Sequence, residues 1–80
     1  MAKISAYGAT EVARIKVRSP GGVEMVYVMA SSGRVLTRYV GDHDRDSNYT
    51  LRGRTQKPER INQEFLIQIA ERDGMTVITA

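Results

Sequence analysis

Three short segments of the chain have the patterns of β-strands, and turns that contain glycine separate them. In residues 12–18, apolar and basic side chains alternate, so the two kinds fall on opposite faces of an extended chain. Residues 23–30 are apolar on both faces, which is typical of a central strand, and residues 34–40 alternate again. Gly22 and Gly33 lie where the chain must turn. We therefore expect an antiparallel meander of three strands.

The second half of the chain predicts a strand, a helix and a final strand. Residues 49–55 resemble a short strand that Gly53 weakens. Pro58 suits the first turn of a helix and Gly74 its C-cap, so we predict a helix from about Pro58 to Arg72. Between them, apolar residues recur at helical spacing and should cover one face of the sheet: Ile61, Phe65, Leu66 and Ile69. Residues 75–79 read as an edge strand, and residues 3–10 as either a short strand or an irregular arm.

These elements predict one α+β domain over residues 1–80, with a mostly antiparallel sheet of three to five strands and a C-terminal helix on one face. A domain of 80 residues buries a small core and so has limited stability. A homo-oligomer, which would add buried surface, is therefore possible. The sequence has no cysteine, so no disulfide is expected. It has no signal-peptide pattern and no apolar run of about 18 residues, so we expect a cytoplasmic protein without a membrane span.

The loop of residues 41–48 contains aspartates and a histidine, which are side chains that can bind metal ions or transfer protons. Asp42, Asp44 and Asp46 match the first positions of a calcium loop, but Ser47 stands where that loop needs glycine. His43, the one histidine, has no second histidine or cysteine to share a metal ion. The sequence therefore predicts a binding protein without enzymatic activity, cofactor or metal.

Basic residues recur at every second position inside the predicted strands, so they form one-sided rows. A row of one sign suits phosphates, and arginine can contact phosphate or guanine with two hydrogen bonds. Solubility explains charged rows equally well. We narrowly favour nucleic-acid binding, with DNA preferred, through a basic face of the sheet. The predicted contacts are Arg14, Lys16, Arg18, Arg34, Arg38, Arg52 and Arg54.

Protein association is the alternative interpretation. The two-sided strand must place one of two apolar strips on the face away from the helix, and such a strip rimmed by arginines suits an acidic protein partner or self-assembly. The strip is either Val26 and Val28 or Val23, Met25, Tyr27 and Met29. Under this hypothesis the anchors would be Met25, Tyr27, Tyr39 and Ile67.

The opening residues 7–11 (Tyr7-Gly8-Ala9-Thr10-Glu11), the basic meander and the single C-terminal helix resemble short uncharacterised proteins of actinobacteria and their phages. The resemblance covers most of the chain in layout. It implies a phage-borne accessory, regulatory or virion-assembly protein, which could then be virion-associated, and it implies no activity or site residue.

Overall fold

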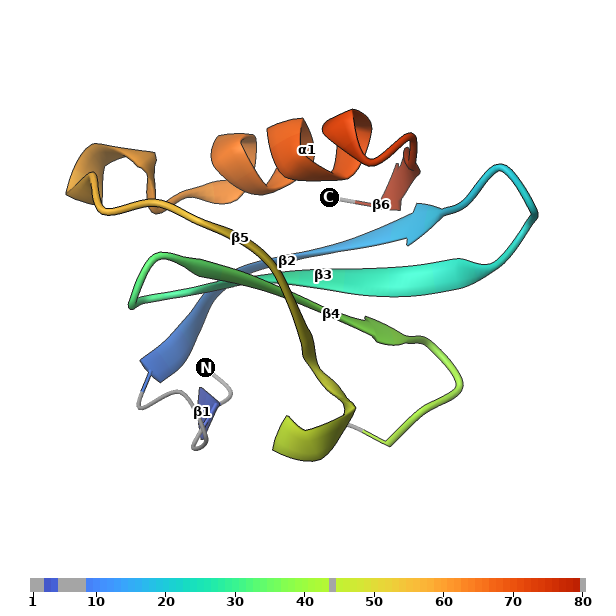
Figure 1. Ribbon diagram of the computed structural model, residues 1–80, viewed down its shortest axis with the longest axis horizontal. Coiled ribbons are helices and arrows are strands. Elements are labelled where there is room, and N and C mark those ends of the chain that lie inside the picture. The colour runs from blue at the N-terminus through green and yellow to red at the C-terminus, as the bar shows by residue number, and fades with distance from the viewer. Residues whose placement is uncertain (1–2, 5–8, 44, 80) are drawn as a thin grey trace.

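The protein folds as an open antiparallel sheet with one helix packed on it, and this confirms the predicted α+β class (Figure 1). The computed structural model describes residues 3–4, 9–43 and 45–79. The strands lie in the order β1-β2-β3-β4-β5, and β6 pairs with β2. Along the chain the elements are β1 (Lys3–Ile4), β2 (Ala9–Arg18), β3 (Glu24–Ala30), β4 (Arg34–Tyr39), the 3-10 turn η2 (Asp46–Asn48), β5 (Thr50–Arg54), the 3-10 turn η3 (Pro58–Arg60), α1 (Gln63–Arg72) and β6 (Thr76–Thr79).

The predicted meander is formed by β2, β3 and β4, and two glycines make its turns. Between β2 and β3, Gly22 has φ +88° and its N–H donates to the Ser19 carbonyl at 2.9 Å. Between β3 and β4, Gly33 has φ +94° and donates to the Ala30 carbonyl at 2.9 Å. Glycine adopts this left-handed backbone without a steric penalty. The two hairpins then fix the register of all three strands.

The main core lies between the sheet and α1. Alternate residues of β2 and β3 point toward the helix, and one apolar stripe of the helix points back at them. Burial of these side chains is the principal source of stability in a domain of this size. The buried members are Ile15, Val17, Met25, Tyr27, Met29, Val35, Leu66, Ile69 and Ala70.

The helix begins later than the sequence predicted. Instead of one helix from Pro58, the structure has the separate turn η3 and then α1 from Gln63. Asn62 causes the break, because its backbone is extended (φ −155°) and its Oδ1 accepts a hydrogen bond from the Phe65 N–H at 2.9 Å. This is N-capping, which satisfies an N–H that the helix itself leaves unpaired.

A second, smaller core covers the sheet face away from α1. After β4 the chain returns beneath this face and places Tyr49 against it (Figure 1). Of the two apolar strips that the sequence left open, Val26 and Val28 form the one on this face, and they are buried rather than exposed. The strand β3 thus has apolar neighbours on both faces, which explains its two-sided pattern. The cluster consists of Ala9, Val26, Val28, Ala30, Leu36 and Tyr49.

The ambiguous opening segment contributes a short strand. β1 pairs with residues 9–10 at the start of β2, while β6 pairs with the other end of β2. Residues 5–8 of the predicted arm lie outside the described residues.

Candidate nucleic-acid interface

The basic rows of β2 and β4 share the sheet face away from α1. In β2 the intervening residues Ile15 and Val17 enter the main core, so Arg14, Lys16 and Arg18 point the other way. In β4, Val35 enters the same core, which directs its two arginines to the face that carries the β2 row. A single basic face requires both rows to lie on the same side of the sheet.

Two glutamates neutralise much of the β2 row. Glu11 accepts hydrogen bonds from the Arg14 guanidinium, with Oε1 2.7 Å from Nη2. Glu24 contacts two cations at once: its Oε2 lies 2.9 Å from Nη2 of Arg18 and its Oε1 lies 3.1 Å from Nζ of Lys16. Hydrogen bonds from Arg18 and Lys16 lower the pKa of the Glu24 carboxyl below its ordinary value. Glu11 lies just before the alternating segment of residues 12–18, so the sequence pattern did not indicate its contact with Arg14.

Arg38 has a structural role that corrects its predicted one. Arg38 is only 8% exposed. Its Nε donates to the Tyr49 hydroxyl at 3.2 Å, and its Nη1 donates to the Asp42 carbonyl at 3.2 Å. The guanidinium also lies over the Tyr49 ring, 5.8 Å from its centroid. Arg38 therefore holds the loop between β4 and β5 against the sheet, and its donors point into the protein instead of toward a ligand.

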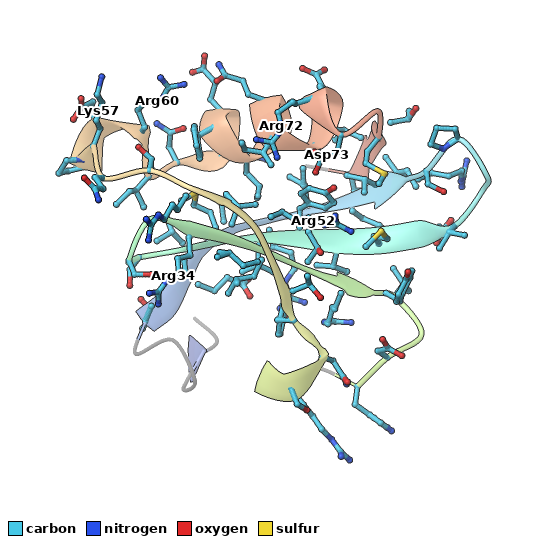
Figure 2. The ribbon with its side chains drawn as sticks, viewed as in Figure 1. Arg34, Arg52, Lys57, Arg60, Arg72 and Asp73 are labelled. Carbon is cyan, nitrogen blue, oxygen red and sulfur yellow. The ribbon has the colours of Figure 1, made fainter. Side chains whose placement is uncertain are left out.

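The β5 strip, which we define as Arg52, Arg54 and Lys57, carries exposed positive charge. Among the side chains that the structure describes, no carboxylate forms an ion pair with any of the three. Figure 2 shows Arg52 on β5 and Lys57 beyond its end, beside η3. The sequence already signalled this region through the excess of basic residues between 49 and 60.

The backbone of β5 is held by neighbours on both sides of its path. The register pairs Arg54 with Arg34 of β4, so two guanidinium side chains start from directly opposite positions. A register shift leaves Arg52 in a bulge, and the Arg72 Nη2 donates to the Arg52 carbonyl at 2.9 Å. A bulge and outward charges are devices that block pairing with a further strand. The side chains of β5 are thus better placed for a ligand than its edge.

Next to the bulge, Tyr27 connects the sheet to the C-terminal end of α1. Its hydroxyl donates to Oδ2 of Asp73 at 2.8 Å, and Oδ1 of Asp73 lies 3.1 Å from Nη2 of Arg72 (Figure 2). Burial, and next the hydrogen bond to Asp73, raise the pKa of the Tyr27 hydroxyl above its ordinary value. This network fixes the helix end beside β5.

The predicted association anchors are separated by the fold. Met25 and Tyr27 are buried beneath α1, so their assignment as surface anchors is wrong. Ile67, expected to be exposed, is half-buried and packs against the same core. Tyr39 is exposed at the end of β4.

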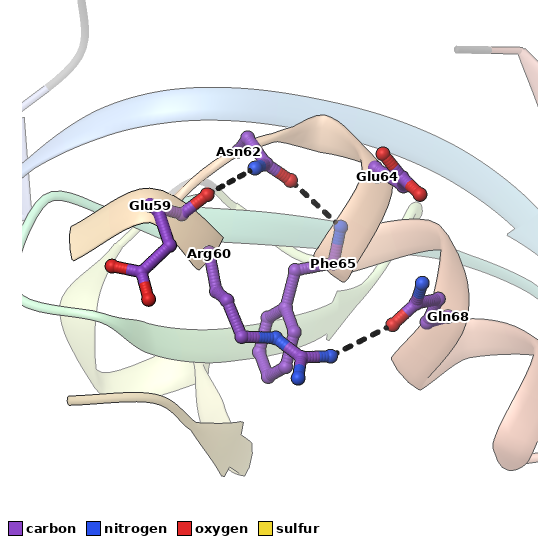
Figure 3. A pocket seen from close by; sticks show the side chains of 6 residues that line it. All are labelled: Glu59, Arg60, Asn62, Glu64, Phe65 and Gln68. Atoms are coloured by element: carbon purple, nitrogen blue, oxygen red, sulfur yellow. Dashed lines mark hydrogen bonds between the residues drawn. The ribbon is translucent and has the colours of Figure 1, made fainter. Parts of the chain in front are cut away.

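A polar hollow of about 250 Å³ lies between η3 and the start of α1 (Figure 3). Its central feature is the Arg60 guanidinium, which lies over the Phe65 ring at 5.1 Å from the centroid. The Arg60 Nη2 donates to Oε1 of Gln68 at 3.1 Å. Asn62, Glu59 and Glu64 complete the lining. The sequence pattern predicts Phe65 as a core residue and does not indicate this hollow.

The described residues contain neither a metal-binding cluster nor a membrane-spanning helix. No three histidine or carboxylate side chains among them are grouped to hold an ion, and none of their helices combines the length and apolarity needed to cross a bilayer. Asp44, one of the predicted calcium-loop positions, lies outside the described residues. His43 is exposed, and its carbonyl accepts from the Asn48 side chain at 2.8 Å.

Comparison of the chain with family models, with curated proteins and with solved structures found no match.

Proposed function

We propose that this protein binds nucleic acid, with the β5 strip as the main phosphate contact. The observation that carries the proposal is the exposure of Arg52, Arg54 and Lys57 without an ion-pair partner among the described residues. Each protein cation that contacts a phosphate displaces condensed counterions from the nucleic acid, and their release gives binding a favourable entropy. The β2 row contributes less, because its cations must first leave Glu11 and Glu24.

The opposed arginines of β4 and β5 support the same placement. Arg34 and Arg54 start from directly opposite positions on the two strands. An anionic backbone beside these positions can contact both guanidinium groups. The planar guanidinium also allows bidentate contact with phosphate, which lysine cannot make. The proposal includes two further points: the protein acts by binding and not as an enzyme, and a phage encodes it.

Two variants with equal charge loss test the placement. The first carries glutamine at the β5 strip (Arg52→Gln, Arg54→Gln, Lys57→Gln), and the second carries glutamine at the β2 row (Arg14→Gln, Lys16→Gln, Arg18→Gln). Each lowers the net charge from +3 to 0. Fluorescence anisotropy of labelled duplex DNA should show the larger loss of affinity for the first variant. The negative slope of log K against log salt should become shallower by about 2.7 in that variant.

The outcomes separate the claims. An equal or larger loss in the β2 variant would move the interface to the basic face that the sequence predicted. Absence of saturable binding by the unaltered protein at low salt would refute nucleic-acid binding.

Self-association is a second candidate, favoured by exposed apolar side chains at one end of the sheet. Tyr39 is 55% exposed and Val23 47%, and the exposed Val40 follows Tyr39 and donates its N–H to the Glu24 carbonyl at 3.2 Å. Aromatic side chains are frequent anchors of protein interfaces. Tyr39→Ser should then reduce dimer formation in sedimentation velocity. A protein that stays monomeric at high concentration would contradict self-association.

A further inference from the structure

We infer that the nucleic acid is single-stranded and that one unpaired base stacks on the platform formed by Arg60 and Phe65. This inference rests on the proposed function and specifies its substrate class. It takes its support from the hollow between η3 and α1, whose walls, floor and charges suit a planar neutral group better than a phosphate (Figure 3).

The walls of the hollow are held by Asn62. Its Nδ2 donates to the Glu59 carbonyl at 2.8 Å, and its Oδ1 accepts from the Phe65 N–H at 2.9 Å. One side chain thereby connects the end of η3 to the first turn of α1. The hollow is preformed by these bonds, so a ligand would order few additional groups on entry.

The floor of the hollow is a cation–π stack. Phe65 packs against the main core with one part of its ring, and the Arg60 guanidinium lies over it at 5.1 Å from the centroid. The hydrogen bond from Nη2 to Gln68 at 3.1 Å restrains the guanidinium in this position. Arg60 is exposed. Bases stack on arginine planes as well as on aromatic rings in complexes with single strands, so a base on Arg60 would extend the existing stack.

The charges around the hollow select a base over a phosphate. Glu59 and Glu64 both belong to its lining, and carboxylates repel a phosphate placed between them. A neutral base meets no such repulsion, and its amino or imino groups can donate to carboxylate oxygens.

Only a few residues of chain separate the β5 strip from this platform. Lys57 is the residue before η3, and Arg54 precedes it by three positions, at most about 11 Å of extended chain. A cationic track beside a stacking platform is the arrangement by which proteins bind single strands. In a duplex the bases are already paired and stacked, so a duplex could use the track but not the platform.

Anisotropy with two DNA probes of one sequence tests this inference: a labelled 12-nucleotide single strand and its duplex. The unaltered protein should bind the single strand at least about fivefold more tightly. Arg60→Lys keeps the charge but removes the plane, so it should lower single-strand affinity about fivefold and leave duplex affinity and the salt slope unchanged. Arg45→Lys is the matched control, an equally conservative change at an exposed arginine of the loop before η2.

A third probe isolates the base. A strand of the same length with abasic sites keeps every phosphate, and it should bind the unaltered protein and Arg60→Lys equally. Equal affinity for single strand and duplex, or an Arg60→Lys variant that matches Arg45→Lys on the single strand, would overturn the inference and leave the proposed function standing. Failure to bind either DNA probe would overturn both.

Discussion

Gly33 positions the β5 strip, and its replacement by alanine is the perturbation that the structure defines most sharply. A Cβ atom at Gly33 would lie 2.1 Å from the Thr55 carbonyl oxygen, and its φ of +94° is unfavourable for any other residue. The Thr55 N–H in turn donates to the Gly33 carbonyl at 2.8 Å. Alanine must therefore displace the chain between Arg54 and Lys57.

Gly22 provides the matched control for the magnitude. Its φ is also positive, at +88°, but nothing lies within 4 Å of the Cβ that alanine would add. Gly22→Ala should therefore lower the free energy of unfolding by the conformational term alone, about 1–2 kcal/mol. Gly33→Ala pays the same term and also loses the hydrogen bond to Thr55, which adds about 1–3 kcal/mol.

Urea unfolding followed by circular dichroism measures both free energies, because a small domain of this kind is expected to unfold in one step. The Gly33 variant should lose clearly more stability than the Gly22 variant, and its DNA affinity should fall because β5 shifts. Equal losses in the two variants would refute the proposed contact between Gly33 and Thr55 and the role of this turn in holding β5.

Three further predictions concern single side chains. Thr37→Val should leave the free energy of unfolding unchanged or raise it, because the buried Thr37 Oγ1 has no hydrogen-bond partner among the described residues. A decrease in this free energy of more than about 1 kcal/mol in urea unfolding would contradict the prediction. Tyr27→Phe should cost about 1–2 kcal/mol. The pKa of the Tyr27 hydroxyl is raised in the folded protein, so the unaltered protein should lose stability as the pH rises above about 10, where the unfolded tyrosine ionises first. This alkaline loss should be smaller in the Phe variant. Equal dependence of the free energy of unfolding on pH in the two proteins would refute the role of the Tyr27 hydroxyl. Glu24→Gln should free Lys16 and Arg18 for phosphates and steepen the salt slope of DNA binding by about 1.8, whereas Glu71→Gln, with the same charge change on exposed helix surface, should not.

Much of the fold could be predicted because local signals agree with one another. The alternation in residues 12–18, the glycines at 22 and 33 and the apolar stripe of the helix all indicate the observed meander and its covering helix. The start of α1 was misplaced because Pro58 and Asn62 are both initiation signals. Pro58 initiates the separate turn η3, and Asn62 caps the helix.

The candidate site was less predictable because its electrostatics depends on contacts between distant residues. That Arg38 is buried follows from the return of the loop that brings Tyr49 beneath the sheet, and no local pattern encodes that return. That Glu24 contacts both Lys16 and Arg18 depends on the hairpin register, which a shift of one residue would reverse. Counting charges along the chain identified the β5 region but could not show which cations are neutralised.

The salt dependence of DNA binding by the unaltered protein tests the central claim most directly. Anisotropy titrations from low to near-physiological salt give the slope of log K against log salt. The three cations of the β5 strip have no ion-pair partner among the described side chains, and they predict saturable binding with a slope of about −2.7 or steeper on duplex DNA. Binding that is absent at low salt, or that does not change with salt, would contradict the assignment of these residues to a nucleic-acid interface.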